Sequence, residues 1–193
     1  MEETPGHDGR PMVHPETLAD WHRWLAAHHD RGSGVWVVSW KRATGRPAVG
    51  YEELVCEALA WGWIDSTAGT VDAERSRLWF APRKPTSGWA RPNKRRVERL
   101  LAEGRMQPAG QAALDTAHAN GSWTLLDDVE DLVEPPDLTA ALDARPGARA
   151  AWEAWPPSVK KVVLTALVQA RKQETRAARV ARYADVAAAG GRP

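Results

Sequence analysis

The stretch VWVVSWKR, residues 35–42, is rich in β-branched and aromatic residues, a composition typical of a β-strand. The Thr44-Gly45 turn and Pro47 that follow would end this strand. Residues 77–82, RLWFAP, have the same character, and residues 63–65 form a shorter third candidate. We expect these three segments to form a small antiparallel sheet.

Helical spacing of apolar residues marks most of the remaining chain. Leu18, Trp21 and Leu25 share one helical face after Pro15, and several later helices begin at a proline. The predicted helices cover roughly residues 15–31, 51–61, 92–103, 108–119, 136–144, 146–155 and 157–189, the last with a break or bend near residues 173–175. The fold class predicted is mainly helical α+β with about three antiparallel strands. It comprises a single domain over residues 14–193 after a disordered leader at residues 1–13.

Composition limits the classes of protein to which the chain can belong. A length of 193 residues with 43% apolar content suits one sizeable core, and a net charge of +1 leaves nucleic-acid binding to a local patch. Cys56 is the only cysteine, so an internal disulfide and a thiolate metal cluster are excluded. The polar first residues lack the apolar core of a signal peptide, and no stretch is long and apolar enough to span a membrane. We expect a cytoplasmic protein.

Charge is distributed unevenly along the chain. Residues 75–97 contain eight Lys or Arg and no acid, whereas six acids crowd residues 127–137. The two segments could simply neutralise each other. Alternatively, the basic segment, which also contains Trp79 and Trp89, could bind a partly anionic and aromatic molecule.

Tryptophan is concentrated around the predicted sheet. Eleven Trp stand against one Phe and two Tyr in the whole chain. Large indole rings can form an aromatic wall that stacks on a planar ligand or a cation. The alternative is that they fill the core as Phe does elsewhere. The candidate walls of a pocket are Trp61, Trp63, Trp79 and Trp89.

Asp65 is the most suggestive single residue, because it follows the apolar run WGWI. A carboxylate in such surroundings should find a basic partner, for which Arg83 and Lys84 are candidates, or carry a raised pKa. It could be a buried ion-pair partner, a group that orients a ligand, or a general acid or base. Ser87 and Asn93 lie between these basic residues and a helix start, where backbone N–H groups favour an anion. The alternative for this loop is a solvated basic surface.

Other familiar chemistries have little support. His28 and His29 point in different directions on a helix, and no carboxylate lies at ligand spacing, so no metal site is predicted. The chain has neither a Gly-rich phosphate loop nor a nucleophile elbow, and no cofactor is expected. Cys56, within an apolar helix, is interpreted as a buried small hydrophobe.

A long collinear series of motifs resembles the YdeI/OmpD-associated family, often labelled bacteriocin-protection proteins. The series runs from YEELVCEALAWGWID through PRKPTSGWARPNKRRVERLLAEGRMQPAG and ANGSW to PPDLTAALDARPGA and ARKQETRAAR, and it covers about residues 15–183. The resemblance carries over the motif residues GWID, PRK, Ser87, Trp89, Asn93, EGRM with Arg105 and Met106, and Thr175 with Arg176. Arg91-Pro92 stands where many relatives have other residues. The family label implies survival of cationic antimicrobial peptides and a link to an outer-membrane porin, with no assigned reaction.

Three functions follow as hypotheses. The first is a cofactor-free cytoplasmic protein that binds a small planar or partly anionic molecule, with a resistance or stress role. Its pocket would have the four tryptophans as walls, Arg83, Lys84, Asn93 and Arg105 as a polar clamp, and Asp65 as the orienting group. The second is an enzyme of natural-product synthesis or detoxification that uses the same pocket, with Asp65 as acid or base. The third and least favoured is nucleic-acid binding through residues 75–96. The sequence indicates no oligomeric state.

Overall fold

The computed structural model describes residues 1–193, whose contacts divide the chain into two compact units. The first unit comprises Met1–Ser87 and Pro92–Ser122, and the second unit comprises Gly88–Arg91 and Trp123–Pro193. The sequence predicted one domain over residues 14–193. That stays a prediction.

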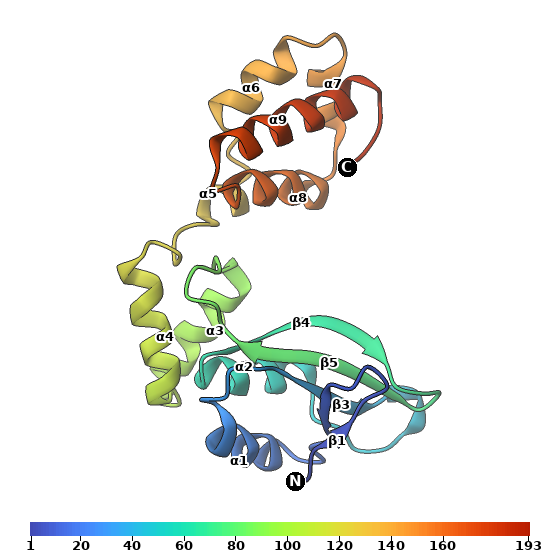
Figure 1. Cartoon of the computed structure of the whole chain (residues 1–193), viewed down its shortest axis with the longest axis vertical. Coiled ribbons are helices and arrows are strands. Elements are labelled where there is room, and N and C mark those ends of the chain that lie inside the picture. The colour runs from blue at the N-terminus through green and yellow to red at the C-terminus, as the bar shows by residue number, and fades with distance from the viewer. The chain divides into compact units, whose positions relative to one another are not determined.

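The first unit is built on a five-stranded sheet with the strand order β1-β2-β3-β5-β4 (Figure 1). The neighbours are antiparallel except for β2 and β3, which are parallel. The three predicted strands are present, but the sheet has five strands and is mixed. The strands are β1 (Thr4–Pro5), β2 (Pro11–Val13), β3 (Val35–Trp40), β4 (Trp63–Thr70) and β5 (Arg75–Pro82).

The two additional strands come from residues 1–13, the segment expected to be a disordered leader. Its polar composition is compatible with strands because pairing at a sheet edge uses backbone groups. Met12 pairs with Trp36 of β3, and Val13 is almost fully buried. Pro5 and Pro11 pair with each other at the outer edge, where a missing N–H is tolerated.

Helices α1 (Leu18–His28) and α2 (Tyr51–Ala60) lie on one side of this sheet (Figure 1). Side chains alternate between the two faces of a strand, and the face toward α1 carries Phe80. The ring of Trp21 on α1 lies 5.3 Å from that of Phe80. Trp24 meets Trp63 of β4 edge-on, with 5.6 Å between the ring centroids. An aromatic layer therefore fills the core between α1 and the sheet.

Helices α3 (Arg91–Ala102) and α4 (Pro108–Ala119) complete the main elements of the first unit, with a short 3-10 helix η1 (Arg42–Thr44) after β3. The start of α4 packs against the end of α2. A Cβ on Gly110 would lie 2.1 Å from the carbonyl oxygen of Ala60. Only glycine permits this approach, which the sequence alone did not predict.

The second unit is a small all-helical bundle. Its core contains Leu138, Leu142, Trp152, Trp155 and Leu167, all nearly fully buried. Pro136 and Pro157 stand at the starts of two of its helices as predicted, whereas the helix predicted from Pro146 begins at Ala148. The long tail breaks at residues 169–172, just before the predicted position. The helices are α5 (Asp127–Glu130), α6 (Pro136–Asp143), α7 (Ala148–Ala154), α8 (Pro157–Val168) and α9 (Gln173–Ala188).

Trp63 is fully buried, so its replacement tests the aromatic layer. We expect Trp63→Ala to lower the free energy of unfolding by about 3–5 kcal/mol, because it removes a large apolar side chain from a packed core. Urea unfolding followed by circular dichroism measures the change. Leu101→Ala, at a side chain that is 43% exposed, serves as the control and should change stability by less than about 0.5 kcal/mol. A loss below 1 kcal/mol for Trp63→Ala would contradict the packing described.

Candidate functional site

The four predicted wall tryptophans do not line one pocket. Trp63 is under α1, where its indole N–H donates to the carbonyl oxygen of His29 at 2.9 Å. Trp79 lies on the other face of the sheet, with its ring 5.2 Å from that of Trp36. Trp61 follows α2, and its N–H donates to Glu57 at 3.2 Å. Trp89 belongs to the second unit and packs there against Trp123, with 5.3 Å between their rings.

The predicted polar clamp is also divided. Arg83 is largely buried, which lowers the pKa of its guanidinium to about 10, and it donates to the carbonyl oxygen of Ser87 at 3.4 Å. Lys84 is exposed. Arg105 lies instead at Glu57, with 3.5 Å between the charged groups, and Met106 packs near Gly110. The structure thus pairs Arg83 with Ser87 and Arg105 with Glu57.

Asp65 has a different partner from the one expected. Its carboxylate accepts a hydrogen bond from the Tyr51 hydroxyl at 3.0 Å and makes no ion pair with Arg83 or Lys84. The prediction failed because Asp65 is only half-buried and faces the first turn of α2, where a neutral phenol satisfies it. Burial and this hydrogen bond raise the pKa of Tyr51, which keeps the phenol protonated as a donor.

A charged cluster lies next to this pair. The Arg96 guanidinium donates to Glu52 at 2.7 Å and to the side-chain oxygen of Asn93 at 2.7 Å, and it lies 5.8 Å from the Tyr51 ring centroid. The predicted residues Asp65 and Asn93 therefore come together through Tyr51, which sequence reasoning had not selected, and Arg96, which it had noted only as part of the basic segment.

Cys56 closes the far side of the charged cluster. It is buried, and Arg99 bridges its sulfur at 2.9 Å and the Glu52 carboxylate at 2.8 Å. Burial raises the pKa of the thiol. Because the thiolate is the reactive form, this cysteine is a packing residue. Hydrogen bonds from Arg96 and Arg99 lower the pKa of Glu52 to about 2.

A second polar cluster surrounds Glu57, one of two buried polar residues in the chain. Besides Trp61 and Arg105, its carboxylate contacts the Nδ1 atom of His22 at 2.7 Å. The sequence contained a signal for it, since Glu57 stands inside the apolar run LVCEALAW just as Asp65 follows WGWI. Glu52 and Glu57, on different turns of α2, therefore each belong to a separate polar cluster.

A groove of about 370 Å³ opens on the sheet face beneath the first turn of α2. Its rim carries the half-buried Trp40 and the exposed Tyr51, and Arg77 is its only charged lining residue. The Arg77 guanidinium contacts the Asp8 carboxylate at 3.4 Å and lies 4.1 Å from the Trp36 ring centroid, while its buried Nε atom makes no hydrogen bond. The other lining residues are small, hydroxyl-bearing or apolar: Val37, Ser39, Ala48, Val49, Leu54, Ala68, Gly69, Ser76 and Leu78.

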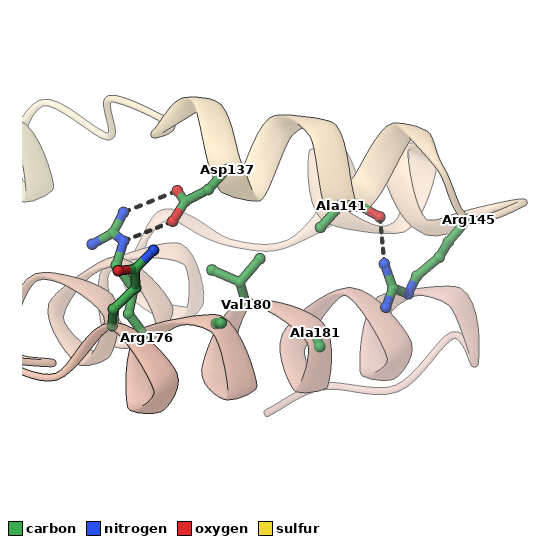
Figure 2. Close-up of a pocket in the computed structure, with 8 residues that line it drawn as sticks. Asp137, Ala141, Arg145, Arg176, Val180 and Ala181 are labelled. Atoms are coloured by element: carbon green, nitrogen blue, oxygen red, sulfur yellow. Dashed lines mark hydrogen bonds and ion pairs between the residues drawn. The ribbon is translucent and has the colours of Figure 1, made fainter.

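The second unit has a groove of about 430 Å³ between α6 and α9 (Figure 2). Ala141, Val180 and Ala181 form much of its surface, with Arg145 and Arg176 toward its ends. Arg176 makes a two-pronged ion pair with Asp137, at 2.6 and 2.9 Å, and Arg145 contacts Asp185 at 2.6 Å. Both cations of this groove are thus already paired with carboxylates of the same unit.

Two family models match different stretches of the chain. Residues 13–113, more than half of the chain, match the family described as Domain of unknown function (DUF8412). The chain belongs to this family. Residues 131–190 match the family described as Bacteriocin-protection, YdeI or OmpD-Associated (OmdA), which confirms the resemblance indicated by the sequence motifs. No curated protein and no solved structure matches the chain.

The candidate sites fall in the regions matched by different family models. The groove beneath α2 and both α2 clusters lie in the DUF8412 region, whereas the α6–α9 groove lies in the OmdA region. The motifs GWID and PRK, which led to the resemblance, fall in the DUF8412 region. No helix is both long and apolar enough to cross a membrane.

Glu57 tests the second cluster. We expect Glu57→Ala to lower the free energy of unfolding by about 2 kcal/mol or more, because the donors of Trp61 and His22 lose their acceptor. Glu57→Gln keeps an acceptor oxygen and should cost less. Chemical denaturation at neutral pH compares the two variants. Equal stability of Glu57→Ala and wild type would show that the cluster contributes nothing to folding.

The lowered pKa of Glu52 predicts that the free energy of unfolding depends on pH. Its pKa in the folded chain, about 2, lies below the ordinary value of 4.5, so the folded state binds fewer protons than the unfolded state between these values. Its contribution to stability is therefore complete above pH 4.5 and is lost as the pH falls toward 2. Glu52→Gln should flatten the dependence of unfolding free energy on pH in this window. Glu98→Gln, at an exposed acid on α3, should leave it unchanged, and an unaltered profile in Glu52→Gln would refute the assignment.

Proposed function

We propose that this protein binds a small planar, partly anionic molecule in the groove beneath α2 and thereby protects the cell from inside, without a cofactor. The observation that carries the proposal is the groove itself. It combines two aromatic residues on its rim, an apolar floor and a single cationic lining residue. Ligand sites commonly combine apolar walls with a few polar groups that fix orientation.

The walls of the groove suit a flat molecule. Trp40 and Tyr51 can contact a planar ring system, while Val37, Leu54 and Leu78 would bury apolar surface. The hydroxyl groups of Ser39 and Ser76 add neutral hydrogen-bonding capacity, and Arg77, whose guanidinium contacts Asp8 at 3.4 Å, is the only cation among the lining residues.

Tyr51 links the groove to the predicted site. Its ring lines the groove, while its hydroxyl is held by Asp65 and its ring lies beside Arg96. Asp65 would therefore act through Tyr51 as a positioning residue. This arrangement supports the binding hypothesis more directly than the hypothesis in which Asp65 is a general acid or base.

The protective role rests on the family description. The OmdA region belongs to a family described by bacteriocin protection. Binding or sequestering a toxic small molecule is a protective activity that such a groove could supply.

The groove can be tested with 8-anilinonaphthalene-1-sulfonate, a flat aromatic anion that fluoresces when bound. We expect saturable binding to the full chain and at least about tenfold weaker binding to Ala68→Trp, which fills the groove. Ala68 is exposed and pairs with Leu78, so the added ring points to the groove side without disturbing the core. Thr67→Trp adds the same ring to the same strand outside the groove lining and should bind normally. Equal binding by both variants would reject the groove as the site.

The role requires a separate readout. Cells that express the wild type should survive a bacteriocin challenge better than cells that express Ala68→Trp at the same level. Protection that persists in Ala68→Trp, when dye binding is lost, would separate the groove from the protective role.

A further inference from the structure

The second unit has another groove besides the one between α6 and α9. It has a volume of about 270 Å³ and lies between α5, the loop before α6, and α8. Its surface is mostly apolar, contributed by Val129, Val133, Pro135, Pro136, Leu164, Leu167 and Val168. Its polar lining residues are Asp128, Glu134 and Arg176. It is an apolar groove with two acids and one cation.

The acids of residues 127–137 differ in how they are compensated. Four of them pair with a basic residue: Glu130 with Lys161, Asp131 with Arg91, Glu134 with Arg149 and Asp137 with Arg176. Asp128 is exposed, lines the groove, and makes no side-chain hydrogen bond or ion pair. With Arg176 and Glu134 already paired, the uncompensated charge at this groove is negative.

The backbone beside the groove has an unusual conformation at Leu132, next to the exposed Val133. Leu132 is the only non-glycine residue with a positive φ, at 57°. It ends α5 in a turn in which the N–H of Val133 donates to the carbonyl oxygen of Asp128 at 2.8 Å. Glycine is the usual residue at this position of such a turn. Non-glycine residues held in this region cluster at active sites, ligand clamps and switch regions. Here the turn places Val133, which is 51% exposed, on the groove surface.

We propose that this groove binds a short cationic amphipathic peptide segment. Apolar side chains of the peptide occupy the surface formed by Val133, Leu164 and Leu167, and an ammonium or guanidinium group pairs with Asp128. Charge complementarity selects this occupant, because an anionic segment would meet an uncompensated carboxylate. The groove is too small for a folded domain and matches a few side chains of an amphipathic segment.

The probe is a fluorescein-labelled amphipathic peptide made only of Leu and Lys, measured by fluorescence anisotropy with the full-length chain. We expect saturable binding that weakens about tenfold in Asp128→Lys and in Val133→Asp. Both side chains are exposed, so the variants should fold, and circular dichroism verifies this. A Leu and Glu peptide of the same pattern should not bind.

Two matched controls lie in the same unit outside the groove. Glu153 is an exposed acid with no side-chain partner, and Val162 is a valine that is 58% exposed. Glu153→Lys and Val162→Asp should bind the Leu and Lys peptide within about twofold of wild type. The proposal is overturned if the wild type does not bind this peptide, if Asp128→Lys binds as well as wild type, or if Glu153→Lys weakens binding equally.

Discussion

Trp63 packs edge-on against Trp24 beneath α1, and its indole N–H reaches the carbonyl oxygen of His29. This contact joins β4 to α1. Trp63, the largest side chain of the motif GWID, is therefore part of the core. A pocket walled by this tryptophan is therefore excluded by the packing that stabilises the first unit.

Helix α2 distributes its polar groups around this core. With 3.6 residues per turn, Glu52 and Cys56 face α3, while Glu57 and the following Trp61 lie near α1 and the loop that carries Arg105. Tyr51, in the first turn, meets both Asp65 and the groove. One helix thereby sets the positions of two charged clusters and the rim of the candidate site.

The second unit uses its charges differently. Its helices α6 and α9 are joined across one groove by paired Asp137 and Arg176. Arg176 also lines the neighbouring groove, where Asp128 is left without a partner. Most acids of residues 127–137 pair with a basic residue, but Asp128 does not. The exposed side chain of Val133 lines the same groove as Asp128 and adds apolar surface to it.

The mainly helical α+β class, the three central strands, most helices and the family of the C-terminal region could be predicted from the sequence, because periodicity, proline starts and motif residues are local signals. Strands β1 and β2 could not, since they are only two and three residues long and lie in a segment whose overall composition is polar. Residues 62–65 were singled out as unusual, but Trp63 and Asp65 received the wrong neighbours. Their partners, Trp24 and Tyr51, lie on different elements, and only the tertiary structure decides which distant side chains meet. The same holds for the grooves, whose shapes depend on how helices and sheet pack rather than on any one stretch of residues.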